Sequence, residues 1–192
     1  MNEPSHSRRA LSCSAVFAAS FLLIWADLRN DEWKDEYIQL LFGQRILHGQ
    51  VPYRDFFEFI FPGSGYAIAA WFKIFGDSME GVRVLNALLG AATVTLAFDI
   101  STTLVSGPLL WIGPVGTLSA YVVGNQGIGH MHFALPLGLA AMALAIRAAS
   151  SGRTRTWFMS GFFAAASGLF TQSIGAWLRL AIFASAPHPT PP

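Results

Sequence analysis

Charged residues are scarce in this chain: Asp, Glu, Lys and Arg make up 12% of its 192 residues, whereas a soluble domain typically carries about 25%. Cysteine is rarer still, since Cys13 stands alone and no internal disulfide can form. The formal net charge is only +1, and no basic cluster along the sequence offers a surface for phosphates. These shortages exclude a disulfide scaffold, an ordinary cytosolic enzyme and a nucleic-acid-binding protein.

Apolar residues are abundant instead. They make up 53% of the chain and raise its mean hydropathy to +0.46, which excludes a disordered chain. Long uncharged runs fit helices that cross a bilayer at about 20 residues each. No alternating strand pattern occurs, so we expect a single membrane domain that is all-α, a polytopic transmembrane helical bundle, and not a barrel. The expected spans are residues 10–26, 59–76, 82–104, 107–123, 131–149 and 157–184.

The first apolar run follows Arg8 and Arg9. A cleaved signal peptide is one interpretation, but further spans follow, so we expect a retained helix. Basic residues tend to stay on the cytoplasmic side, so these two arginines predict a cytoplasmic N-terminus and an extracytoplasmic first loop. Counting crossings from there places the arginines of residues 147–155 outside as well, against the same rule. One expected crossing must therefore be miscounted, re-entrant or short.

Residues 27–58 form an acidic loop between the first two expected spans. Connections longer than about 12–15 residues usually carry function; a solvated loop that merely repels other surfaces is the alternative. The stretch from residue 36 to 48 has no proline, so we expect a helix lying at the membrane surface there. The loop holds most of the chain's eleven acidic residues, namely Asp27, Asp31, Glu32, Asp35, Glu36, Asp55 and Glu58.

An ordered string of short motifs runs through this loop into the second expected span. It resembles the first loop of the GT-C membrane glycosyltransferases, the group of the protein mannosyltransferases and aminoarabinose transferases. The resemblance covers residues 31–83, and His132 and the segment 161–175 are similar to later parts of that family. The string reads Asp35-Glu36-Tyr37, then His48-Gly49-Gln50-Val51-Pro52-Tyr53-Arg54-Asp55, then Phe61-Pro62-Gly63, then Phe75-Gly76-Asp77-Ser78 and Arg83.

The resemblance implies an enzyme of the bacterial inner membrane that transfers a sugar from a polyprenyl-phosphate donor to an extracytoplasmic acceptor. Its partners are then the lipid bilayer, the lipid-linked sugar and an acceptor that the sequence does not identify. No cofactor is called for, since the lipid-linked sugar is itself the substrate, and a divalent metal is left open. A transporter or a non-catalytic membrane subunit is the alternative, although a transporter is expected to place its acids near mid-membrane instead of in a loop.

The acidic residues of this loop can act as the general base in glycosyl transfer. The acceptor hydroxyl loses its proton as it attacks the anomeric carbon, and a carboxylate within hydrogen-bond reach can accept that proton, which contributes typically about 10²–10⁴-fold. Asp35 matches the family's loop acid and is the expected general base, with Glu36 beside it. Asp31 is the alternative, because residues 31 and 35 share one face of a helix and two close carboxylates perturb each other.

Tyr53, Arg54, Asp55 and Arg83 are the expected substrate-binding residues. Arginine matches the geometry of phosphate, so Arg54 and Arg83 are candidates for contacting the lipid phosphate. For Arg83 the alternative is a snorkelling headgroup anchor. Asp55 either orients the acceptor or forms a turn with Arg54.

Three further features lie outside this string of motifs: an acid in the third expected span, a pair of histidines and a Pro-rich C-terminal segment. Asp99 is either an intramembrane acid, and so a functional candidate, or an interfacial one. His130 and His132 alone make a poor metal site, so we expect no metal there. Residues 185–192 form a Pro-rich tail unlike the apolar run before it, and because the family has more spans than this chain, we expect an N-terminal fragment.

Overall fold

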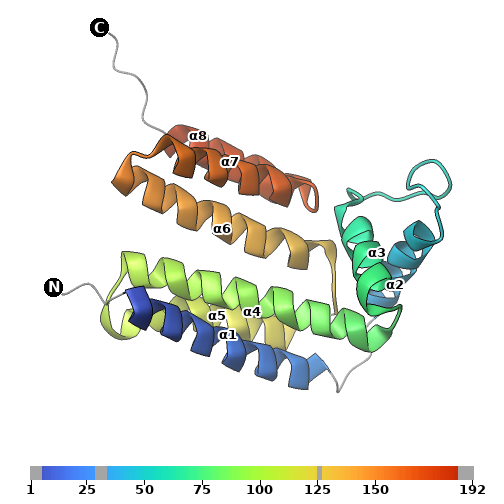
Figure 1. Ribbon diagram of the computed structural model, residues 1–192, viewed down its shortest axis with the longest axis horizontal. Helices are drawn as coiled ribbons and strands as arrows, with labels where there is room; N and C mark the ends of the chain where they lie inside the picture. The colour runs from blue at the N-terminus through green and yellow to red at the C-terminus, as the bar shows by residue number, and fades with distance from the viewer. Residues whose placement is uncertain (1–5, 29–33, 125–126, 186–192) are drawn as a thin grey trace, which may run out of the picture.

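A computed structural model describes residues 6–28, 34–124 and 127–185 of the chain. All regular elements in these ranges are helices, which confirms the all-α fold class. Most helices lie side by side in a bundle, and two stand apart at one end (Figure 1). The helices are α1 (His6–Leu28), α2 (Lys34–Leu47), α3 (Gly63–Phe75), α4 (Met79–Leu104), the 3₁₀ helix η1 (Gly107–Trp111), α5 (Ile112–Gly124), α6 (His130–Ser151), α7 (Thr154–Gly168) and α8 (Gln172–Ser185).

Three helices are long and apolar enough to cross a membrane, namely α1 from Ser7 onward, α4 and α6. The apolar segment η1–α5 is shorter. α4 packs against α1, α5 and α6, and Gly90 permits the close approach, since a Cβ there would lie 2.7 Å from Cδ1 of Ile24. Helices of this length and apolarity identify a membrane protein.

Helices α2 and α3 form a hairpin that lies across one end of the bundle (Figure 1). The two helices approach closely because glycines face the partner: a Cβ on Gly43 would lie 2.4 Å from Cγ2 of Ile68, and one on Gly65 would lie 2.8 Å from Cε2 of Phe42. The expected helical span over residues 59–76 is therefore corrected to a shorter helix. Helix begins there only at Gly63 and packs on α2 instead of running alongside the bundle helices.

The expected single span over residues 157–184 is also corrected, because it consists of two helices joined by a tight turn. The N–H of Thr171 donates to the carbonyl of Ser167 at 3.1 Å as α7 ends. The chain can reverse there because two glycines touch: a Cβ on Gly175 would lie 2.3 Å from Cα of Gly168. The resulting pair, α7 and α8, packs along α6.

Buried serines connect α7 to α6. Ser160 donates to the carbonyl of Ala141 at 2.8 Å, and Ser167 donates to the carbonyl of Ala134 at 3.0 Å. Small residues and hydroxyl hydrogen bonds of this kind hold helices together where lipid removes the hydrophobic driving force between them.

The packing of α1, α4 and α6 brings arginines from distant parts of the chain to one end of the bundle. α1 begins where α4 and α6 end, because Asp99 of α4 pairs with both Arg9 of α1 and Arg147 of α6. The α6–α7 connection follows at the same end. We call it the arginine end, and the opposite end, with the α2–α3 hairpin, the hairpin end. Both groups of arginines therefore lie at the same end of the bundle, opposite the α2–α3 hairpin. The arginine end carries Arg8, Arg9, Arg147, Arg153 and Arg155.

Candidate functional site

A buried ion pair joins the first turn of α2 to the beginning of α4. Glu36 is completely buried, and its Oε2 lies 3.3 Å from Nη2 of Arg83, whose side chain is 12% exposed. Nε of Arg83 donates to the same oxygen at 3.4 Å. Removing one partner of a buried pair leaves an uncompensated charge and typically costs about 3–5 kcal/mol. The pair therefore holds α2 on α4, and it engages the guanidinium that the sequence assigned to a lipid phosphate.

Asp35, the expected general base, lies in the same first turn of α2. The Glu36–Arg83 pair thus fixes the backbone of Asp35 at the hairpin end, where α4 begins. The positive end of the helix dipole favours a carboxylate in a first turn. Asp31, the alternative base, lies outside the described residues.

The Tyr53–Asp55 segment closes the loop between α2 and α3. The Asp55 carboxylate accepts hydrogen bonds from Nε and Nη2 of Arg54 at 2.9 and 2.8 Å, and from the N–H of Val51 at 2.7 Å. These hydrogen bonds lower the pKa of Asp55 to about 2, and the bond from Arg54 has a larger effect than the bond from Val51. Tyr53 has a φ of 67°, and its hydroxyl donates to the carbonyl of Ile60. This geometry matches the turn interpretation of Asp55.

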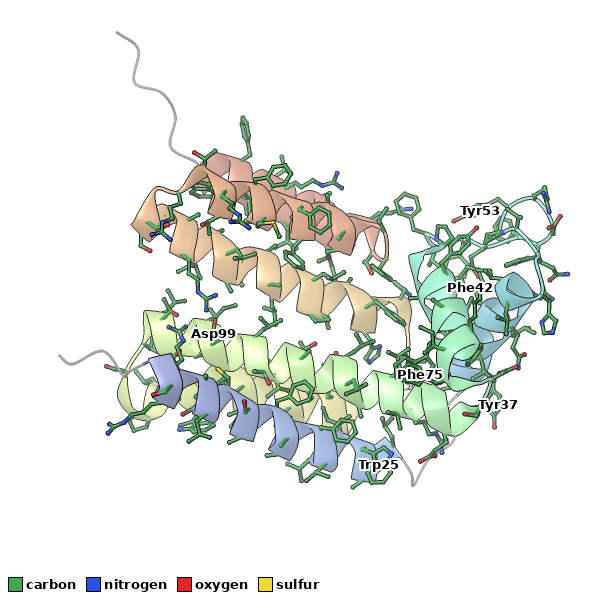
Figure 2. All side chains as sticks on the ribbon, viewed as in Figure 1. Trp25, Tyr37, Phe42, Tyr53, Phe75 and Asp99 are labelled. Atoms are coloured by element: carbon green, nitrogen blue, oxygen red, sulfur yellow. The ribbon has the colours of Figure 1, made fainter. Side chains whose placement is uncertain are left out.

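The structure does not bring the two groups of candidate residues together. The rise of α2 from Asp35 to Leu47 is about 18 Å at 1.5 Å per residue. Tyr37 and Tyr53 accordingly lie at opposite ends of the hairpin (Figure 2). Phe56, which follows Asp55, packs on Phe42 in the second half of α2, at 5.6 Å between ring centroids. Asp35 and Asp55 therefore do not share a reaction centre.

A cleft at the hairpin end connects the first loop with the α7–α8 turn. It consists of two neighbouring pockets, a more apolar one of about 600 Å³ and a more polar one of about 190 Å³, which share the lining residues Phe61 and Phe170. The contact is tight, since a Cβ on Gly63 would lie 2.5 Å from the carbonyl oxygen of Leu169. A lining that is apolar at one side and hydroxyl- and amide-rich at the other suits an amphipathic molecule. The apolar part adds Pro62, Gly63, Tyr66, Ala67 and Leu169, and the polar part adds Phe59, Ile60, His130, Thr171, Gln172 and Ser173.

This cleft is the feature that sequence reasoning missed. Residues 61–63 and the segment 161–175 were each singled out, but nothing in the sequence indicates that they meet. Their proximity depends on the glycine turn between α7 and α8, and the sequence predicted a continuous helix there.

His132 is engaged at the start of its own helix. Nδ1 of His132 accepts from the N–H of Gly129 at 2.9 Å and so caps the start of α6. Its ring packs edge-on against Tyr121 at 5.3 Å between centroids. Within residues 6–28, 34–124 and 127–185, no group of three His, Cys, Asp or Glu residues has the arrangement to hold a metal ion.

Asp99 lies at the arginine end and not at the middle of the bundle (Figure 2). Its Oδ1 accepts from Nη2 of Arg9 at 2.6 Å, and its Oδ2 accepts from Nη2 of Arg147. The sequence left open whether this acid was intramembrane or interfacial, and the structure places it among charges at an end.

No family model, curated protein or solved structure matches the chain.

Proposed function

We propose that the chain is a membrane glycosyltransferase of the GT-C kind, which transfers a sugar from a polyprenyl-phosphate donor to an acceptor at the hairpin end. One observation carries the proposal: the buried Glu36–Arg83 pair fastens the first turn of α2, with Asp35 in it, where the apolar helix α4 begins. A carboxylate at that level can meet a donor embedded in lipid and an acceptor that approaches from water.

In this proposal Asp35 is the general base. It accepts the proton of the acceptor hydroxyl while that oxygen attacks the anomeric carbon and the phosphate leaves. Glu36 and Arg83 are positioning residues, since they are engaged with each other. Asp55 and Arg54 hold the loop that leads to the cleft, and take no part in the chemical step.

The proposal places the hairpin end outside the cytoplasm of a bacterial inner membrane. The arginine end then lies inside, in agreement with the tendency of basic residues to remain cytoplasmic. This orientation fits a polyprenyl-phosphate donor, because lipid-linked sugars replace nucleotide sugars as donors on the side of the membrane where nucleotide sugars are absent. A transporter gains no support, since the acids among the described residues lie at the two ends of the bundle.

Transfer from radiolabelled polyprenyl-phosphate hexoses and pentoses, measured in membranes that carry the chain, tests the function. Asp35→Asn keeps the size of the side chain but removes its proton-accepting charge, so the rate should fall on the order of 10²-fold or more. Glu80→Gln, at an exposed acid in the first turn of α4, is the matched control and should leave the rate unchanged. Absence of transfer by the unaltered chain, or equal small losses in both variants, would contradict the proposal.

A further inference from the structure

We propose that the arginine end binds the phosphate groups of anionic phospholipids. The site consists of Arg9 and Arg147, held together by Asp99, and of Arg153 and Arg155 at the beginning of α7. It lies at the opposite end of the bundle from Asp35, so it does not rest on the proposed glycosyl transfer.

Asp99 holds two arginines from different helices in one place. Besides its two bonds to Oδ1 of Asp99, Arg9 donates from Nη2 to the backbone carbonyl of Asp99 at 3.1 Å and to Oγ1 of Thr103 at 3.0 Å. Arg147 reaches the other carboxylate oxygen from α6. One carboxylate against two guanidinium groups leaves one positive charge in excess. Both arginine side chains remain partly open to the surroundings, with exposed fractions of 34% and 48%.

The beginning of α7 adds further positive charge. Gly152, with a φ of 65°, ends α6 in a left-handed turn, and Arg153 and Arg155 follow at once. Both are exposed, and the first turn of α7 carries no acidic residue. The N-terminus of a helix is itself the positive end of the helix dipole, so basic residues there are unfavourable unless an anion lies nearby.

The surroundings indicate that this anion belongs to a lipid. Trp111 is 49% exposed and packs on Phe98, next to Asp99, with 5.3 Å between ring centroids. A half-exposed tryptophan near the end of apolar helices is typical of the headgroup level of a bilayer. Guanidinium groups bind phosphate oxygens in pairs, and basic clusters between or beside membrane helices attract anionic lipids.

Lipid selectivity in reconstituted bilayers tests this site. The complete chain is placed in phosphatidylcholine vesicles that contain a trace of spin-labelled phosphatidylglycerol or, separately, of spin-labelled phosphatidylcholine. Electron spin resonance gives the relative association of each lipid with the protein. We expect phosphatidylglycerol to be preferred several-fold, and Arg153→Gln and Arg155→Gln each to lower that preference toward equal association of the two lipids. Both arginines are exposed, so neither change should unfold the bundle, and circular dichroism checks that.

Arg54→Gln is the matched control, since Arg54 is an exposed arginine at the hairpin end. It should leave the preference unchanged. Equal association of both lipids with the unaltered chain, or a loss of preference in the Arg54 variant alone, would overturn the proposal. Inorganic phosphate replacing chloride at equal ionic strength should also leave the preference intact. If it abolishes the preference, the arginines bind the free anion and the lipid assignment is wrong.

Discussion

Glu36 and Arg83 are separated by 47 residues and meet in the interior. Glu36→Gln leaves the Arg83 charge buried without its carboxylate, and the free energy of unfolding should fall by about 3–5 kcal/mol. Replacing both residues by methionine removes both charges, and this double variant should be more stable than Glu36→Met alone or Arg83→Met alone. Titration of the purified protein in detergent with sodium dodecyl sulfate measures all of them. Losses that simply add in the double variant would mean that the two groups do not interact.

Long-range pairs mark the limit of sequence reasoning at this scale. The acids and arginines were recognised singly, but their partners were not. Asp99 was left as an intramembrane or interfacial acid because nothing near it in the chain predicts Arg9, 90 residues away. Asp55 is the opposite case: its partner Arg54 is adjacent, so the turn interpretation was available from the sequence.

At the scale of elements, composition predicted helices well and their ends poorly. The helices α1, α4 and α6 coincide with expected spans, because long uncharged apolar runs admit few other structures in a membrane. The α2–α3 hairpin did not follow from composition, since residues 59–76 are as apolar as a crossing. Its packing depends on Gly43 and Gly65, whose positions become meaningful only once the two helices are known to face each other.

The α7–α8 turn offers a direct test of close glycine packing. Any side chain at Gly175 would meet Gly168, so Gly175→Ala should lower the free energy of unfolding by about 1–3 kcal/mol. Gly161 also lies in α7, but a Cβ there would have no neighbour within 4 Å. Gly161→Ala should therefore be neutral or slightly stabilising, because alanine favours helix. The detergent titration described above compares the two. Equal effects would show that α7 and α8 are not in contact at Gly168.

For the molecule as a whole, we propose that the hairpin and the arginines lie on opposite sides of the membrane. The expected crossing at residues 59–76 would place the acidic loop and the α6–α7 connection on the same side. The hairpin lies at one end of the bundle and both groups of arginines lie at the other, and we expect the arginine end to be the cytoplasmic one. The proposed glycosyl transfer and the lipid site use opposite ends of this arrangement.

Single cysteines in a Cys13→Ala background test this arrangement most directly. Gln50→Cys lies in the exposed loop of the hairpin, and Ser151→Cys lies at the exposed end of α6, beside the arginines. A membrane-impermeant maleimide applied to intact spheroplasts should label Gln50→Cys and should label Ser151→Cys only after permeabilisation. Labelling of both positions in intact spheroplasts would contradict the account, because it would restore residues 59–76 as a crossing and put the arginines outside.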